Sequence, residues 1–289
     1  MQIFYKIKVF LWNGFAGCGE IFFLDIPKQF VSRLPHVSKS NFYMNIVIPM
    51  AGNGSRFQQA GYKKPKPFID VNGIPMIEVV MKNIFIKNAK YYLIAKQEHL
   101  DAEKETVKTL TGKYNITFIT LENNKTTEGA ACTVLHARKY INNDEMLMFA
   151  NSDQFVDANI PNFVQDMLDR NLDASIMTFN DNKNDPKWSY AKTDSNGLVT
   201  QVAEKVVISN QSTVGIYLYR HGRIFVDAAI DMIVRNDRFN NEFYVCPSYN
   251  YVIKNGYKCG IYEIPASAMH GMGTPEDLEK FLTSNKVAK

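Results

Sequence analysis

The sequence predicts an α/β protein with a mostly parallel, doubly wound sheet and helices on both of its faces. Three apolar segments, 45–50, 91–95 and 116–121, have the composition of strands that are buried on both sides. Segments with helical spacing lie between them, so that strands recur at intervals of about thirty residues, as in a Rossmann-like sheet. Ligands of such sheets bind at the carboxyl ends of the strands.

The first strand ends in a glycine-rich turn that we expect to bind phosphate. The turn contains Ala51, Gly52, Asn53 and Gly54. Glycines let the backbone bend and approach a ligand, and the N–H groups of such a loop above a helix start form a concavity that suits phosphate. The alternative is a tight strand-to-helix turn alone, because the sequence has neither GxxxxGK[ST] nor a complete GxGxxG.

Basic residues follow the turn closely and would face the same anion. Arg56 comes first, and three lysines follow, of which Lys66 lies between Pro65 and Pro67. The two prolines fix φ on either side of Lys66 and remove two backbone donors, so they stiffen the segment that carries this ammonium. We therefore interpret residues 44–71 as a polyphosphate site rather than as a solvated basic surface.

The runs GNGSR and PKPFIDVNGIPMIE in this segment resemble the signature of the sugar nucleotidyltransferases. Members of this pyrophosphorylase family join a nucleoside triphosphate to a sugar phosphate. The similarity extends from Met44 to about Leu282, so we assign 44–289 to a nucleotidyltransferase domain. The resemblance implies that the glycine loop and Arg56 hold the β and γ phosphates and that Lys66 contacts the α phosphate.

The loop 123–128 follows the third strand and leads into a helix that is expected to run from Gly129 to about Tyr140. The resemblance places the backbone that touches the nucleobase at Gly129, and an amide side chain for the base at Asn124. A glutamine is more familiar at this position in the thymidylyl and uridylyl enzymes. The base therefore stays open, and Asn124 is alternatively an ordinary loop residue.

Asp153 is the candidate metal ligand. It follows an apolar strand that begins at Met146 and meets polar residues abruptly at Asn151. Mg²⁺ keeps most of its waters and takes one or two carboxylates plus substrate phosphate oxygens. The resemblance implies the same role for Asp153, whereas the alternative is a residue that only ends the strand. One position departs from the family, which usually has a second metal-binding aspartate where this chain has Gly271. The neighbouring His270 is either a ligand or structural.

The second half of the chain is interpreted as acceptor-binding. Residues 188–191 and 199–204 alternate as a β-hairpin around an Asn-Gly turn at 196–197, which predicts a small insertion. In the family, the Glu-Lys pair at the end of this hairpin contacts the sugar; a surface ion pair is the alternative. A glycine in the strand 212–219 indicates a close approach of ligand or backbone. The candidate acceptor-binding residues are Tyr190, Ala191, Glu204, Lys205 and Gly215.

Two further helices are predicted near the carboxyl terminus. One should begin at 241–244 and run to Asn255. The other should begin after an N-cap at Thr274, because proline follows at the first helical position and acidic residues occupy the first turn.

The composition is that of an ordinary globular protein of 289 residues, with 46% hydrophobic and 21% charged residues. A net charge of +4 is too small to indicate a nucleic-acid partner, and no segment predicts a membrane partner. The four cysteines show no metal-binding spacing, which favours a reduced, cytoplasmic protein. The sequence does not indicate an oligomeric state.

Residues 1–43 are an N-terminal extension outside the family pattern. Lys6 and Lys8 precede an apolar run that ends at Cys18 and could pass for an export signal. Asn13 interrupts that run, which is also too short for a transmembrane helix, and an enzyme that uses nucleoside triphosphates finds them in the cytoplasm. We expect Met44, directly before the first strand, to be the real start.

The predicted reaction is attack by a phosphate oxygen of the acceptor on the α phosphorus of a nucleoside triphosphate, with release of pyrophosphate. A phosphate monoester has a second pKa of about 6, so the nucleophile is already ionised and needs no general base. The product would serve surface-polysaccharide synthesis. The alternatives are a cytidylyltransferase with a non-sugar phosphate acceptor, a catalytically weak nucleotide-sensing protein and a dinucleotide-dependent oxidoreductase.

Overall fold

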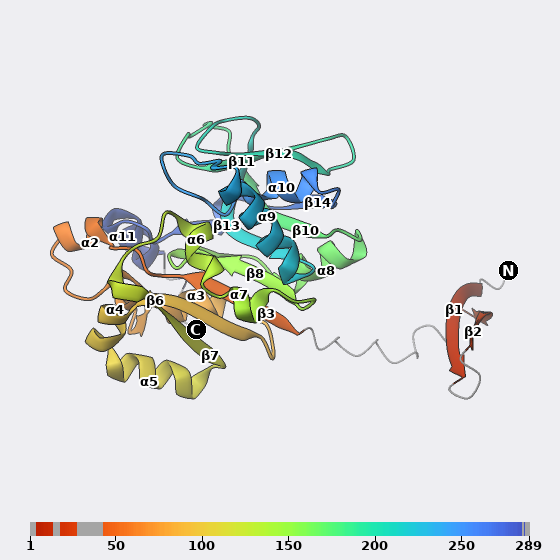
Figure 1. The fold of residues 1–289 in the computed structure, drawn as a ribbon, viewed down its shortest axis with the longest axis horizontal. Coiled ribbons are helices and arrows are strands. Elements are labelled where there is room, and N and C mark those ends of the chain that lie inside the picture. Colours follow the sequence, from red (N-terminus) through yellow and green to blue (C-terminus); the bar gives the residue numbers. More distant parts are fainter. Residues whose placement is uncertain (1–3, 14–17, 28–42, 285, 287–289) are drawn as a thin grey trace. The chain divides into compact units, whose positions relative to one another are not determined.

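The computed structural model describes residues 4–13, 18–27, 43–284 and 286, and the chain forms two compact units. The first unit, Met1–Asn41, contains an antiparallel hairpin of β1 (Phe4–Asn13) and β2 (Cys18–Pro27). The second unit, Phe42–Lys289, contains the remaining elements (Figure 1). No helix in the described part of the chain is long and apolar enough to cross a membrane.

A nine-stranded sheet forms the centre of the second unit. Its parallel part consists, in spatial order, of β8 (Met146–Ala150), β3 (Met44–Pro49), β6 (Lys90–Lys96) and β7 (Ile116–Leu121). On the other side of β8 lie β13 (Gln211–Tyr219), β11 (Ser189–Thr193), β12 (Val199–Glu204), β10 (Ala174–Asn180) and β14 (Cys259–Ile264). The predicted α/β sheet with its parallel first strands is therefore confirmed.

Helices cover both faces of the sheet, and alternate residues of β3 contact the two layers. Ile46 and Ile48 belong to one hydrophobic cluster, whereas Val47 belongs to the other. The first cluster contains residues of α2 (Ser55–Gln59), α3 (Met76–Asn83), α4 (Gln97–Ala102), α5 (Lys104–Lys113), α8 (Ile160–Asp169) and α11 (Pro275–Thr283). The second contains residues of α6 (Ala130–Leu135), α7 (Arg138–Ile141), α9 (Gly222–Val234) and α10 (Ser248–Lys254). Burial on both faces explains why β3 has no polar alternation.

Shorter elements complete the unit. They are two small antiparallel pairs, β4 (Asp70–Val71) with β5 (Ile74–Pro75) and β9 (Gln154–Val156) with β15 (Met269–Gly271), and the 3₁₀ turns Lys66–Phe68, Glu122–Asn124 and Ala266–Ala268. The predicted helix start at Thr274 is confirmed, because its Oγ1 accepts a hydrogen bond of 3.1 Å from the backbone N–H of Asp277.

The predicted hairpin forms with the expected turn, and it extends the central sheet because β11 pairs with β13. The helix predicted over 129–140 is divided into α6 and α7. The helix predicted to begin at 241–244 instead begins at Ser248. Asn240 and Asn241 have φ angles of 47° and 63°, which a right-handed helix does not allow, and Phe239 and Glu242 exchange two backbone hydrogen bonds in a turn.

The glycine turn after β3 has one position that requires glycine. Gly54 has a φ of 63° at the start of α2, and a Cβ there would lie 2.9 Å from the Cβ of Lys66. Gly52 has an ordinary backbone conformation, and nothing lies within 4 Å of a Cβ placed on it. The two glycines therefore differ in what they do for the fold.

Replacing Gly54 with alanine should lower the free energy of unfolding by about 1–2 kcal/mol, because an L residue in the left-handed region costs about that much. Gly52→Ala is the matched control and should change it by no more than about 0.5 kcal/mol. Urea denaturation of the two variants measures both values. Equal effects would contradict the conformational difference.

A chain that begins at Met44 should melt within about 2–4 °C of the full chain, the shift that corresponds to about 1 kcal/mol in a protein of this size. The reason is that β3 and its neighbours β6 and β8 all belong to the second unit, which has its own two-layered core. Differential scanning calorimetry of both chains checks this. A larger drop would show that the first 43 residues pack on that core.

Candidate active site

Two adjoining cavities open at the carboxyl ends of β3 and β8, where the sheet type predicts a ligand. Their volumes are about 570 Å³ and about 200 Å³. They share a wall made by Pro49, Gly52, Gly54, Ser55 and Ser152. The glycine turn thus lies between two spaces, one large enough for much of a small ligand and one the size of a small anion.

The smaller cavity is the cationic one. Arg56, at the start of α2, and Lys66 both line it, together with Gly273 from the segment that follows β15. Lys66 lies in a 3₁₀ turn whose flanking Pro65 has φ −54° and ψ 141°, so the two prolines hold the short segment that carries the ammonium. The structure thus brings the glycine turn, Arg56 and Lys66 together around one cavity, as predicted.

Lys66 and Asp153 form the central contact of the site, although 87 positions separate them in the chain. The Nζ of Lys66 lies 2.5 Å from the Oδ2 of Asp153, and the side chains are 19% and 23% exposed. A charge-assisted hydrogen bond of this kind is strong and directional. Asp153 itself lines the larger cavity, so the pair joins the two spaces.

The segment around Gly271 contacts Asp153 and holds it in place. The backbone N–H of Met272 donates to the backbone oxygen of Asp153 at 2.7 Å, and a Cβ on Gly273 would lie 3.0 Å from the Asp153 carboxylate. A Cβ on Gly271 would lie 3.9 Å from the carboxylate of Asp277. The described residues contain no group of three or more His, Cys, Asp or Glu that could hold a metal ion. Asp153 lines the larger cavity and is the acid there that contacts Lys66.

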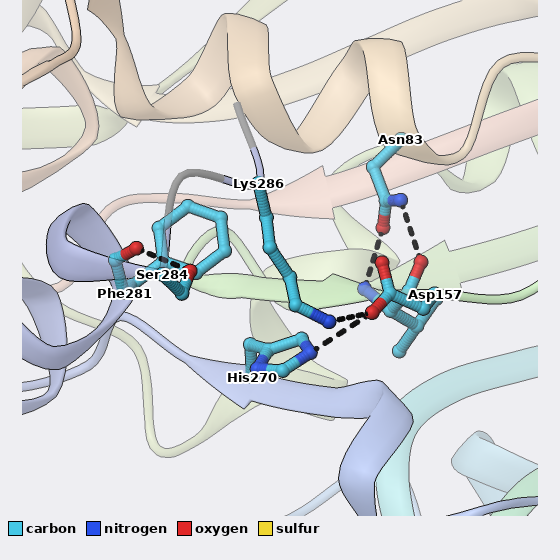
Figure 2. Close-up of polar contacts among 7 residues, drawn as sticks. Asn83, Asp157, His270, Phe281, Ser284 and Lys286 are labelled. Atoms are coloured by element: carbon cyan, nitrogen blue, oxygen red, sulfur yellow. Dashed lines mark hydrogen bonds and ion pairs between the residues drawn. The ribbon is translucent and has the colours of Figure 1, made fainter. Parts of the chain in front are cut away.

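His270 points to a different carboxylate. Figure 2 shows His270 and Lys286 converging on Asp157, with the Nε2 of His270 3.2 Å from the Oδ2 of Asp157. Burial raises the pKa of the Asp157 carboxyl, but the hydrogen bonds from Lys286 and His270 outweigh burial and hold this pKa below its usual value. Asn83 binds the backbone of Val156 through both its amide atoms. These contacts tie β9 to α3, and they tie the residue after β9 to β15 and to Lys286, which follows α11; this is a structural role.

The opposite wall of the larger cavity comes from the loop before α6. Gly129 lines it with a φ of 123°, and a Cβ there would overlap the backbone of Phe243 at 2.4 Å. Thr127 Oγ1 donates to the backbone oxygen of Gly129 at 2.9 Å. Asn124 lines neither cavity, and its Oδ1 accepts a hydrogen bond of 3.2 Å from the backbone N–H of Glu98. Gly129 is thus in the site, whereas Asn124 is held beside α4.

Sequence reasoning missed several residues of the site. Lys96, at the end of β6, lines neither cavity but is 8% exposed and donates to the Oδ1 of Asn53 at 2.6 Å, so it fixes the glycine turn. Its place at a strand end was the available signal. The missed residues that line the larger cavity are Thr133 of α6 and five residues in loops that carry no recognisable pattern: Thr126, Thr127, Asn151, Ser152 and Glu242.

The predicted acceptor-binding residues lie around the hairpin and line neither cavity. Tyr190 is fully buried, and its hydroxyl donates to Asp181 at 2.7 Å, while Ala191 is also buried. Glu204 accepts a hydrogen bond of 2.5 Å from the Ser189 hydroxyl, and burial raises the pKa of the Glu204 carboxyl. These contacts give Tyr190 and Ala191 a packing role.

Lys205 contacts Tyr244, and Gly215 lies against a residue of the cavity wall. The Nζ of Lys205 donates to the Tyr244 hydroxyl at 2.9 Å and lies 4.7 Å from the centroid of that ring. Gly215 has a φ of 80°, and a Cβ there would overlap the side chain of Asn151, which lines the larger cavity. The missing side chain therefore makes room for a neighbouring strand end, which is the close approach that its position predicted.

Comparison with known proteins agrees with this geometry. The chain is similar to the bifunctional protein GlmU of Methanococcus aeolicus, with 26% identity over 180 residues, which are 62% of this chain and 40% of that protein. The match thus spans less than half the length of that relative. The fold is similar to the nucleoside-diphosphate-sugar pyrophosphorylase of Vibrio cholerae RC9, with a TM-score of 0.70, 26% identity and coverage of 82% of this chain and 99% of that chain.

A second solved structure, UDP-glucose pyrophosphorylase complexed with UDP-glucose, shares the fold at 12% identity, with a TM-score of 0.69 and coverage of 86% of this chain and 100% of that chain. The family described as nucleotidyl transferase matches residues 46–249, which is more than half of the chain and includes the glycine turn, Lys66 and Asp153. The protein therefore belongs to the nucleotidyl transferase family.

Proposed function

We propose that this protein transfers a nucleotidyl group from a nucleoside triphosphate to a sugar 1-phosphate, which yields a nucleoside diphosphate sugar and pyrophosphate. The observation that carries the proposal is the contact between Lys66 and Asp153, at the junction of an anion-sized cavity and a larger one. The similarity to a nucleoside-diphosphate-sugar pyrophosphorylase supports a nucleotide sugar as the product.

Different residues bind the phosphate end and the base end of the nucleotide. In the smaller cavity Arg56 and the N–H groups of the glycine turn bind the β and γ phosphates. Lys66 neutralises the charge that develops at the α phosphate, and the base lies in the larger cavity near Gly129. The acceptor phosphate is already ionised at neutral pH, so positioning and charge neutralisation are sufficient for catalysis.

The donor set suits Mg²⁺ as the metal. Asp153 would hold it together with phosphate oxygens of the nucleotide, because Mg²⁺ needs only one or two carboxylates when the substrate supplies the rest. A bound Mg²⁺ would supply positive charge that offsets the charge of the transferred phosphate. Lys66 donates to the Asp153 carboxylate, so a triphosphate that draws Lys66 toward its own oxygens would free that carboxylate for the metal.

Glu204 and Lys205 are proposed to bind the acceptor. Lys205 donates to the hydroxyl of Tyr244, which lies two residues from Glu242 in the cavity wall. A role in surface-polysaccharide synthesis in the cytoplasm fits the proposed product. Pyrophosphate release from a panel of triphosphates with sugar 1-phosphates and non-sugar phosphates tests the proposal. If none of these acceptors supports pyrophosphate release, the proposal is contradicted.

Lys66→Ala should lower turnover by about 10²–10³, the usual cost of one preorganised charge donor at developing charge. Triphosphate affinity should change less, because Arg56 and the loop amides remain. Lys64→Ala is the matched control, since Lys64 is 53% exposed and lines neither cavity. Steady-state pyrophosphate release measures both variants. Normal turnover in Lys66→Ala would remove this lysine from the mechanism.

Titration of Mg²⁺ into the nucleotide-free protein should show no site tighter than about millimolar, because Asp153 is already paired with Lys66 and the described residues contain no group of three or more acids or other ligands that could hold a metal. Calorimetry with and without triphosphate measures this. Asp153→Asn should remove most activity and the Mg²⁺ response in the presence of triphosphate. A tight site in the nucleotide-free protein would mean that other acids bind the metal.

A further inference from the structure

A third cavity lies at the free edge of the sheet, away from the glycine turn. Its volume is about 400 Å³, and β7, which forms one wall, is the last strand of the sheet. The other wall is the segment that joins α6 to α7 and the first turn of α7. The lining residues are Phe118, Ile119, Thr120, His136, Arg138, Lys139 and Tyr140, none of which lines the two catalytic cavities.

The third cavity is cationic and lacks a compensating acid. No lining residue is a carboxylate, and no carboxylate of the described residues forms an ion pair with Arg138 or Lys139. The Nζ of Lys139 lies 4.8 Å from the centroid of the Tyr140 ring, which stacks on Tyr92 at 4.8 Å. The ammonium of Lys139 thus lies over an aromatic ring that is itself packed against Tyr92, and Arg138 lines the same cavity, so an anion there meets two positive charges.

The remaining lining groups define the kind of anion. Ile119, which belongs to the same hydrophobic cluster as α7, is half-buried and offers apolar contact, while the His136 ring offers hydrogen bonds. A volume of about 400 Å³ lies within the range of roughly 300–1,000 Å³ that is usual for sites of small molecules. Arginine and lysine together match the charge of a phosphate group. We propose that this cavity binds a small organic phosphate as an effector of the catalytic site.

Both walls of the third cavity continue into the larger catalytic cavity. α6 ends at Leu135, beside His136, and its other end places Ala130 and Thr133 in the catalytic wall. β7 runs into the loop that carries Thr127, and the hydroxyls of Thr127 and Thr133 lie 2.5 Å apart. A ligand that draws β7 and the 136–140 segment together therefore acts on two elements that meet at the nucleotide. This coupling rests on the proposed function, whereas the binding does not.

Hydrogen exchange of the full chain tests the binding. The probes are orthophosphate, nucleoside monophosphates and a nucleoside diphosphate sugar. At least one of the organic phosphates should slow exchange at 116–121 and 136–140, and the double variant Arg138→Gln, Lys139→Gln should lose this protection. Lys108→Gln, at an exposed lysine of α5, should keep it. Lys139→Gln alone gives the same comparison if the double variant does not fold. Protection confined to the glycine turn, or unchanged in the variants, overturns the site.

Triphosphate titration in the presence of the protecting probe tests the coupling. The dissociation constant of the triphosphate should change by at least about fivefold, the lower range of allosteric coupling, and the double variant should show no change. Because a probe that competes in the catalytic cavity would act on both proteins alike, the variant separates competition from coupling. Protection at 116–121 without any change in triphosphate binding overturns the effector role. Failure of triphosphate to bind at all would instead refute the proposed function and leave the protection result standing.

Discussion

The contact between Lys66 and Asp153 is the interaction on which the site depends. It joins the end of β8 to the proline-flanked turn after α2, and these segments carry the walls of both cavities. Its value is positional rather than energetic, because ion pairs that remain partly exposed contribute little to stability. In the proposed function, the Lys66 ammonium would bind a phosphate oxygen and the Asp153 carboxylate would bind a cation.

The surrounding structure leaves this contact little freedom. Gly54 packs against the Cβ of Lys66 with a φ that other residues rarely adopt, and Gly273 lies against the Asp153 carboxylate. Lys96 holds Asn53 from the neighbouring strand end. The position of the two charges therefore follows from close backbone approaches at glycine and from one buried lysine, and these approaches rest on a sheet that is packed on both faces.

The departure of this chain from its family has a structural counterpart. Gly271, where the family usually has an aspartate, pairs with Gln154 between β15 and β9, and its neighbour His270 is directed to Asp157. The segment thus serves to support Asp153 from the backbone side. Asp153 in turn pairs with Lys66 through its carboxylate.

The sequence by itself determined the features that arise within a few residues. The buried run of β3, the turn at Gly54, the stiff Pro65-Lys66-Pro67 segment and the Thr274 cap all follow from local backbone preferences. The hairpin and its Asn-Gly turn are of the same kind. The resemblance to a family added the roles of these residues, which periodicity alone does not carry.

The tertiary structure alone decided which of the distant residues meet. Lys66 and Asp153 lie 87 positions apart, and the contact of Lys96 with Asn53 spans 43. Asn124 was equally plausible as a base contact, but the loop turns its amide to α4. Asn240 and Asn241 adopt left-handed conformations, so the helix that was expected to begin at 241–244 cannot begin there. These outcomes depend on packing between separate elements, which a local sequence pattern does not encode.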